Sequence, residues 1–274
     1  PEYLIGVYID SCRHVHINAQ RIAGIQEERR QWLASQGIHY YLMIPPQKAS
    51  IYPEMLPARL RRTGHYNCLD EMIGYLRAHT QVPVIDCREE MLAMKREHDV
   101  FYDVDIHWNP IGGWVGYKKL MDAIGHDVPA AGPPVPFNSF TIEPDTNDQG
   151  DLATLMGVND VMMRITPMLV SDSATKAEDA PAVDLPGSEF FRYGPVIKQQ
   201  ADTTKPRLLM LRDSFAVYMI PLLSEHFSRS TYVWTPVFIP EEVLQERPQV
   251  VVQEVMEIFI RDLINDTQSK PRAM

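Results

Sequence analysis

The sequence contains few cysteines. Only Cys12, Cys68 and Cys87 occur in 274 residues, an odd number without the spacing of metal ligands, so neither a disulfide framework nor a zinc site is implied. We interpret all three as small apolar residues.

Long apolar runs are also lacking. No run has the length of a membrane span, and no signal peptide opens the chain. Because the first residue is Pro1, the missing signal does not tell whether the protein carries a leader.

Basic residues are fewer than acidic ones. The chain has 26 Lys and Arg against 36 Asp and Glu, a formal net charge of -10, which would repel the phosphates of a nucleic acid. The only dense basic group is Arg59, Arg61 and Arg62, which we interpret as a solvated helix face. We therefore expect no nucleic-acid partner.

The composition is typical of a soluble globular protein, with 45% hydrophobic and 23% charged residues, and the length suits one large α/β domain or two small ones. Strands and helices alternate over the first hundred residues. The predicted strands are 3–10, 39–44 and 82–86, and the predicted helices are 18–36, 56–80 and 88–98. This alternation predicts a parallel, doubly wound sheet.

The pattern changes after residue 100. Residues 101–110 are too polar for a buried strand, and Pro110 opens a helix whose two glycines suggest close packing or approach to a ligand. Residues 125–136 are predicted as a linker or surface loop, and 137–200 as an inserted antiparallel subdomain with a short helix at 151–156. The α/β pattern then resumes with strands 230–234 and 249–253 and helices 241–246 and 257–264. We therefore expect one domain over 1–274, with 137–200 inserted.

The segment 207–227 is predicted as a buried strand, a tight turn at Asp213 and Ser214, and an amphipathic helix. The helix is indicated by apolar residues that recur at helical spacing, namely Val217, Ile220, Leu223 and Phe227. A serine at such a junction has its hydroxyl at the mouth of the sheet, where the first amides of the helix can stabilise an oxyanion. The same position is far more often that of a helix N-cap, because Ser and Asp are common capping residues.

A serine nucleophile needs a base, and the base needs a carboxylate that holds it in one tautomer. Asp105 and His107 can supply both groups, because residues two apart in an extended segment project to the same side. Two other interpretations remain: a histidine merely satisfied by its neighbour, and a metal site formed by Asp103, Asp105 and His107. Without a second histidine, we disfavour the metal site.

With these residues in place, the chain resembles the SGNH-hydrolase-like domain of the alginate O-acetyltransferase family, which modifies bacterial exopolysaccharides. Four stretches carry the resemblance, in family order: 42–57 (LMIPPQKASIYPEMLP), 102–113 (YDVDIHWNPIGG), 150–157 (GDLATLMG) and 209–227 with its Arg-Asp-Ser-Phe core. In that family an Asp-x-His motif precedes the serine, the reverse of ordinary SGNH hydrolases, and this chain has the reversed order.

The resemblance implies a three-layer α/β/α sandwich around a mostly parallel sheet, with Ser214 as nucleophile, His107 as general base and Asp105 as its orienting acid. A second serine, Ser11, also ends an apolar strand. Ordinary SGNH hydrolases pair such an early serine with a histidine near the C-terminus, but no histidine follows His226, so we favour Ser214.

The implied activity is transfer of acetyl groups to polysaccharide hydroxyls through an acetyl-serine intermediate, in the periplasm or at the cell surface. No cofactor is implied. The implied partners are a polysaccharide acceptor and an acetyl donor delivered by a membrane acyltransferase. A carbohydrate acetylesterase with the same triad and a catalytically silent polysaccharide-binding subunit remain alternatives.

Four further residues are candidates for substrate contact. Arg212 and Tyr218 flank the serine, Trp108 has a ring that can stack on a sugar, and Lys48 lies in a motif of the resemblance. A role in packing is equally open for each, and Arg212 can instead pair with a carboxylate.

Overall fold

The computed structural model describes residues 12–58, 68–148, 150–158, 160–171, 175–181, 183–264 and 266. The strands are β1 (His39–Met43), β2 (Val84–Ile85), β3 (Thr141–Asp148), β4 (Arg164–Val170), β5 (Glu178–Asp179), β6 (Val196–Gln199), β7 (Arg207–Arg212), β8 (Arg229–Trp234) and β9 (Val250–Glu254). The α-helices are α2 (Cys12–Ser35), α3 (Lys48–Ile51), α4 (Cys68–His79), α5 (Arg88–Met94), α6 (Pro110–Asp127), α7 (Asp151–Met156), α8 (Ile220–Ser224) and α9 (Pro240–Glu246). Short 3-10 helices are η1 (Pro53–Met55), η3 (Pro129–Ala131), η4 (Phe137–Ser139), η5 (Ser188–Phe190), η6 (Ser214–Tyr218) and η7 (Glu257–Ile264).

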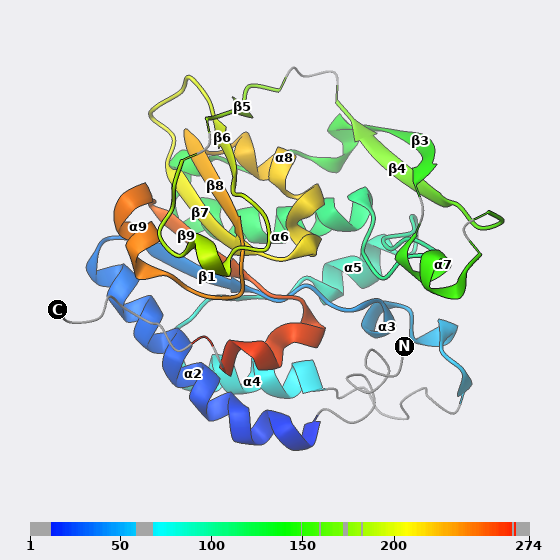
Figure 1. The fold of residues 1–274 in the computed structure, drawn as a ribbon, viewed down its shortest axis with the longest axis horizontal. Helices are drawn as coiled ribbons and strands as arrows, with labels where there is room; N and C mark the ends of the chain where they lie inside the picture. The colour runs from blue at the N-terminus through cyan, green and yellow to red at the C-terminus, as the bar shows by residue number, and fades with distance from the viewer. Residues whose placement is uncertain are drawn as a thin grey trace.

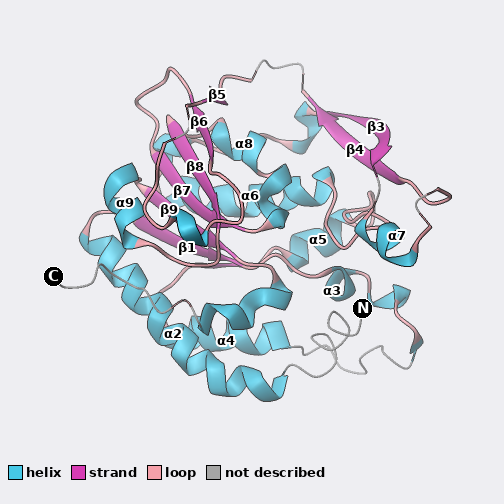
Figure 2. Ribbon diagram, in the orientation of Figure 1, coloured by secondary structure: helices cyan, strands magenta, loops and turns pink. Residues whose placement is uncertain are grey.

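The main sheet has the strand order β2-β1-β9-β7-β8-β6-β5. Pairing is parallel from β2 through β8, whereas β6 and β5 add an antiparallel edge. Helices cover both faces of this sheet (Figures 1 and 2), with α5, α6 and α8 on one side and α2, α4 and α9 on the other. The predicted three-layer α/β/α architecture is confirmed.

Successive side chains of the central strands enter opposite layers of the core, as the period of two in a β-strand requires. In β7, Leu208 and Met210 join the cluster under α6, and Leu209 and Leu211 join the cluster under α2. The apolar run that predicted this strand is thus explained by helices on both faces.

Most predicted elements occur with small shifts at their ends. The strand predicted at 39–44 is β1, and the helix that Pro110 opens is α6, begun by Asn109, whose side chain accepts from two amides. The helix expected after Ser214 is wrong in form, because η6 and α8 replace one continuous helix and Pro221 lies at the start of α8. Val217 is correspondingly 44% exposed instead of facing the core.

The segment 137–200 is divided between two sheets. Strands β3 and β4 form a separate antiparallel pair, as expected, but β5 and β6 extend the main sheet. The segment therefore contributes strands to both sheets, and the division of the chain into domains stays a prediction. The strand expected at 3–10 and the basic group at 59–62 lie outside the described residues.

Among the helices of the described residues, none has the length and apolar character that a membrane span requires.

Of the three cysteines, Cys87 is fully buried and has a free thiol, consistent with a small apolar residue of the core.

Glu242 in α9 is a buried acid. Within the described part of the chain, neither of its carboxylate oxygens has a hydrogen-bond partner. Burial, followed by the neighbouring charge of Glu246, raises the pKa of Glu242 from 4.5 to about 8. The folded protein therefore holds a proton that the unfolded chain releases near the ordinary pKa, so stability falls as pH rises between these two values.

Replacing Glu242 by glutamine removes this titration. Relative to Glu242→Gln, we expect the free energy of unfolding of the wild type to fall as pH rises from 4.5 to about 8, by up to about 1.4 kcal/mol per pH unit. Urea denaturation over this range measures it. The control Glu241→Gln changes an exposed neighbour and should run parallel to the wild type; an equally parallel Glu242→Gln would contradict the prediction.

Candidate active site

Ser214 lies at the carboxyl end of β7, in the middle of the parallel part of the sheet. Reactive groups of open α/β sheets gather at this edge. The residue that caps η6 is Asp213, whose carboxylate accepts from the amide of Phe215 at 2.8 Å. Because Asp213 serves as the cap, the hydroxyl of Ser214 is left to face the loop before α6.

That loop, residues 99–109, carries Asp105 and His107 between α5 and α6. It folds back on itself, with the amide of Tyr102 donating to the carbonyl of His107 at 3.3 Å and the amide of Asn109 to the carbonyl of Val100 at 3.1 Å. Asn109 also caps α6. The loop is therefore anchored on both sides of His107.

The structure joins Asp105, His107 and Ser214 in one hydrogen-bond chain. Oδ1 of Asp105 lies 2.6 Å from Nδ1 of His107, and Nε2 of His107 lies 2.8 Å from Oγ of Ser214. The side chain of Asp105 is 3% exposed and that of His107 is 26% exposed. A proton on Nδ1 that faces Asp105 leaves Nε2 free to accept from the serine hydroxyl, which is the arrangement of an activated nucleophile.

Asp105 has partners on both oxygens. Oδ1 also accepts from the amide of His107 at 2.9 Å, and Oδ2 accepts from Nη1 of Arg164 at 2.7 Å. Burial by itself raises the pKa of Asp105, but the hydrogen bonds from His107 and the charge of Arg164 outweigh it and hold the pKa well below its usual range. Asp105 is therefore an ionised carboxylate in a fixed orientation.

Sequence reasoning missed Arg164, which begins β4 in the small antiparallel sheet. Its guanidinium also lies 4.3 Å from the centre of the Tyr102 ring. The available signal was a single charged residue inside the otherwise largely apolar segment 161–170.

The motif 150–157 lies directly against Asp105. The amides of Leu152 and Ala153 donate to the carbonyl of Val104, and a Cβ on Gly150 would collide with that same carbonyl. The motif thus supports the loop, and only a glycine permits this approach at position 150.

Asp105, His107 and Asp151 have ligand-type atoms within 4.8 Å of one another. The metal site considered from sequence had Asp103 in place of Asp151. Since Arg164 and His107 already donate to the oxygens of Asp105, we assign the group to the hydrogen-bond chain.

Lys48, predicted to contact substrate, supports the loop. Its ammonium group donates to the carbonyls of Tyr102, Asp103 and Asp105 at 2.5, 2.9 and 3.2 Å. Burial lowers the pKa of Lys48, and nearby carboxylates, first Asp103, oppose that shift. All three N–H groups are thus directed at backbone oxygens, and contact of Lys48 with substrate stays a prediction.

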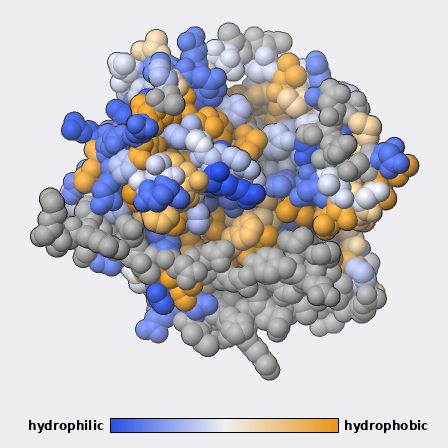
Figure 3. Space-filling view, in the orientation of Figure 1, coloured by the Kyte–Doolittle hydropathy of each residue, from blue (hydrophilic) through white to orange (hydrophobic). Residues whose placement is uncertain are grey.

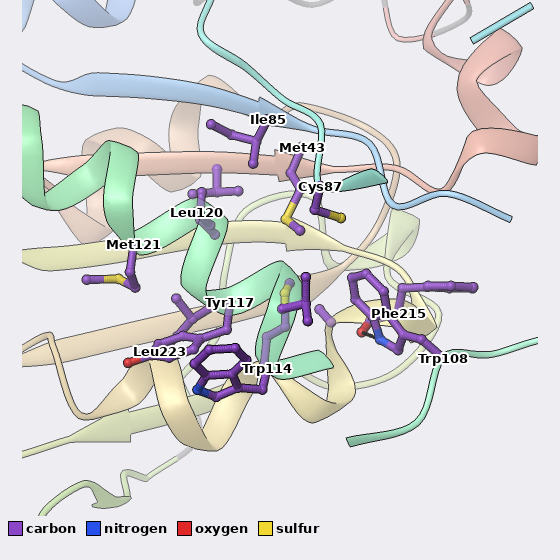
Figure 4. Packing of buried hydrophobic residues seen from close by; sticks show 14 of the residues in the cluster. Met43, Ile85, Cys87, Trp108, Trp114, Tyr117, Leu120, Met121, Phe215 and Leu223 are labelled. Carbon is purple, nitrogen blue, oxygen red and sulfur yellow. Dashed lines mark hydrogen bonds between the residues drawn. The ribbon is translucent and has the colours of Figure 1, made fainter. Parts of the chain in front are cut away.

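The structure places Trp108 in the core, whereas the sequence prediction had its ring at the substrate surface. The side chain is fully buried, its indole N–H donates to the carbonyl of Phe215 at 2.8 Å, and the two ring systems pack 5.1 Å apart. Figure 4 shows the pair side by side within the core cluster. A ring without exposed surface cannot stack on a sugar.

Arg212 is 5% exposed and lies 4.3 Å from the centre of the Trp234 ring. Its Nη1 donates to the carbonyl of Asp213 at 3.2 Å. Burial lowers the pKa of Arg212, and the nearby carboxyl groups of Glu254 and Asp213 oppose that shift. The prediction that it contacts substrate is corrected to a role in packing the serine turn.

Tyr218 remains a candidate for substrate contact. Its hydroxyl shares a hydrogen bond with that of Tyr102 at 2.5 Å, and its side chain is partly exposed. A Cβ on Gly113 would lie 2.5 Å from the Cβ of Tyr218, so the helix α6 closely approaches η6. The predicted close packing of this glycine is confirmed.

The surface around Arg164 is apolar. Exposed side chains of α7, of the segment 161–163 and of the start of β4 form it, and Figure 3 shows orange atoms at the right-hand edge where Figure 1 places α7 and β4. They are Leu155, Met156, Val161, Met162, Met163 and Ile165, with exposures of 44% to 74%. The rival serine, Ser11, lies outside the described residues.

A protein-family model described as an SGNH hydrolase-like domain, acetyltransferase AlgX, matches residues 12–189 of the chain. Two curated relatives are both called probable alginate O-acetylase AlgJ. The one from Pseudomonas syringae pv. tomato is 29% identical over 138 residues, which cover 50% of this chain and 35% of the relative. The one from Pseudomonas aeruginosa is 25% identical over 214 residues, which cover 75% and 50%. This chain therefore spans about a third to a half of the length of these relatives.

Solved structures share the fold. PatB1 of Bacillus cereus, in a structure with a sulfonyl adduct, matches with a TM-score of 0.69 and 16% identity, covering 92% of this chain and 91% of that one. The O-acetyltransferase domain of Pseudomonas putida AlgJ matches with a TM-score of 0.63 and 18% identity, covering 93% and 88%. At these identities the likeness concerns the fold alone.

The bond between Arg164 and Asp105 yields a test. We expect Arg164→Met to lower the rate at which Ser214 reacts with a sulfonyl fluoride about tenfold or more, because a hydrogen bond to a charged group is lost from the chain that activates the serine. Arg164→Lys should retain part of the rate. Arg192→Met is the matched control, since Arg192 also lies near aromatic rings, those of Tyr193 and Trp234, and has no contact with Asp105. Equal rates in Arg164→Met and Arg192→Met would contradict the assignment.

Proposed function

Because this chain belongs to the AlgX family of SGNH-hydrolase-like acetyltransferase domains, we propose that it is an O-acetyltransferase that moves acetyl groups to hydroxyls of a bacterial exopolysaccharide. The observation that carries the proposal is the unbroken chain from Asp105 through His107 to Ser214, with links of 2.6 and 2.8 Å. A nucleophile, its base and the group that orients the base are the three parts that acyl transfer through serine requires.

In the first half-reaction, Nε2 of His107 takes the proton from Oγ of Ser214 while Oγ attacks the carbonyl carbon of the acetyl donor. The tetrahedral intermediate carries its negative charge on the former carbonyl oxygen. The amide of Ser214, as the first amide of η6, has no partner within that helix and is a donor for this oxygen. When the intermediate collapses, the donor's leaving group departs with the proton from His107, and acetyl-serine remains.

In the second half-reaction, His107 takes the proton of a sugar hydroxyl, whose oxygen attacks the acetyl-serine. Collapse of this intermediate forms the sugar ester and returns the proton from His107 to Oγ of Ser214. Asp105 stays ionised throughout and stabilises the positive charge that His107 carries in both halves. If water replaces the sugar, the same steps release acetate, and the protein acts as an acetylesterase.

The silent binding subunit is the weaker alternative. A subunit without catalysis has no need to keep Ser214 within hydrogen-bond reach of His107, or to hold Asp105 ionised with Arg164. The separation of 2.8 Å between Nε2 and Oγ supports catalysis, since contacts in unliganded sites are often longer.

The acceptor, donor and location are part of the proposal. The acceptor is a polysaccharide and the acetyl donor is delivered by a membrane acyltransferase, in the periplasm or at the cell surface. The names of the AlgJ relatives as alginate O-acetylases support this placement.

Intact-mass spectrometry after incubation with a chromogenic acetyl ester tests the nucleophile. We expect the wild type to gain one acetyl group and to release the chromophore, and Ser214→Ala to lose turnover by about a thousandfold or more, as removal of a triad nucleophile does. Ser11→Ala is the control and should behave as the wild type.

The second measurement adds oligosaccharide acceptors and follows acetylated sugar against free acetate. Acetylated sugar supports transfer, and acetate alone favours the esterase.

In the assay with the chromogenic ester, loss of turnover only in Ser11→Ala would mean that Ser11 is the nucleophile. No turnover in any protein, the wild type included, would contradict the proposed function.

A further inference from the structure

A second carboxyl group is buried directly behind the serine turn. Glu254 is the last residue of β9 and is 1% exposed. Strands β7 and β9 pair in parallel, with Leu211 opposite Gln253, so the residues that follow lie next to each other. Glu254 therefore meets Asp213, the residue immediately before Ser214.

Hydrogen bonds tie the two residues together. The amide of Asp213 donates to Oε2 of Glu254 at 2.8 Å. The carboxylate of Asp213 in turn accepts from the amide of Phe215 through Oδ1 and from the amide of Met256 through Oδ2, each at 2.8 Å. These bonds fix the backbone on both sides of Ser214 and link it to the end of β9.

The partners of the two carboxyl groups are unequal. Asp213 receives an N–H group on each oxygen, which favours its ionised form. Oε1 of Glu254 receives none from the described residues, although it is buried. A buried carboxylate oxygen without a donor is unfavourable, and a second negative charge beside it is more so. A proton on Oε1, donated to Asp213, removes both problems.

We propose that Glu254 is a positioning residue whose carboxyl group stays protonated and, by donating its proton to Asp213, holds the turn that presents Ser214 to His107. The activity part of this proposal rests on the proposed function, because it takes Ser214 as the nucleophile. The protonation of Glu254 does not depend on that assignment.

The electrostatic surroundings agree with a proton on Glu254. Burial, and then the charge of Asp213, raise the pKa of Glu254 well above its ordinary value. The other charged or titratable groups that act on the pair are Arg212 from β7, which favours ionisation of Glu254, and His107 from the loop before α6. Arg212 is itself buried, and its Nε has no partner in the described part of the chain.

Loss of the proton would place two negative charges in contact beneath Ser214. The hydrogen bond between the carboxyl groups would become a repulsion, and the turn would no longer be held in the geometry that gives 2.8 Å between Ser214 and His107. The reactivity of the serine should therefore fall in alkaline solution, in a step that belongs to Glu254 and not to the triad.

The test compares Glu254→Gln with Glu254→Leu in the whole chain. Glutamine has nearly the same shape, and its amide donates to Asp213 at every pH, whereas leucine removes the donor. Glu257→Gln is the matched control, because Glu257 is also a buried acid with a raised pKa, owing first to its burial, but it is bonded to Gln47 and Ser50. The rate of reaction of Ser214 with a sulfonyl fluoride is measured against pH for all four proteins.

We expect Glu254→Gln to react within about threefold of the wild type at neutral pH and to lack the alkaline fall, and Glu254→Leu to lose about tenfold or more at all pH values. Glu257→Gln should keep the profile of the wild type. The proposal is overturned if Glu254→Gln shows the same alkaline fall as the wild type, or if it loses as much reactivity as Glu254→Leu.

Two measurements separate this proposal from the assignment of the nucleophile. Carbon-13 NMR of glutamate carboxyl groups at neutral pH should show, besides the signal of Glu242, whose pKa is raised to about 8, a neutral carboxyl that disappears in Glu254→Gln; an ionised Glu254 would overturn the proposal whether or not Ser214 reacts. The free energy of unfolding of the wild type should also fall relative to Glu254→Gln as pH rises above 4.5, because the folded protein retains a proton that the unfolded chain releases. If Ser214 is unreactive in every protein while Glu254 is protonated, the proposed function fails and the positioning role in reactivity fails with it.

Discussion

The site depends on the contact between Trp108 and Phe215. Each of these residues follows a member of the proposed triad, His107 in one case and Ser214 in the other, and the indole N–H donates to the carbonyl of Phe215 at 2.8 Å. This bond joins two segments that lie 107 residues apart. Since it is buried with both rings packed together, it fixes the separation of His107 and Ser214 far more firmly than their own partly exposed hydrogen bond can. Packing in the core thus aligns His107 with Ser214.

Three carboxyl groups near the serine behave differently because their partners differ. Asp105 is buried, but a guanidinium and the imidazole compensate its charge, so it stays ionised and can stabilise a positive His107. Burial raises the pKa of Asp213, but the two amides that donate to its oxygens oppose that shift and favour its ionised form. On one of its oxygens Glu254 has no such donor among the described residues, and we propose that it keeps a proton. The same functional group, a carboxyl, serves as charge stabiliser, as helix cap and, in our proposal, as hydrogen-bond donor, according to the groups around it.

Local pattern predicted most of the parallel sheet, because a strand covered on both faces needs a continuous apolar run, as in β7. The order of the Asp105, His107 and Ser214 motifs predicted which side chains the structure would bring together. What local pattern did not show depended on contacts between distant segments. Lys48 and Trp108 have side chains suited to substrate, and only the packing of the loop against them shows that backbone carbonyls and the core occupy them. The pairing of β6 with β8 and the bond from Arg164 are equally invisible to local periodicity.

The most direct test of the preformed triad is to locate the most reactive serine by peptide mapping. The protein is treated with a limiting amount of a fluorophosphonate, digested, and the modified residue is identified by tandem mass spectrometry, alongside His107→Ala. A preformed chain of 2.6 and 2.8 Å hydrogen bonds predicts modification at Ser214 alone and its loss in His107→Ala. Modification at another serine, or at Ser214 equally in both proteins, would contradict it.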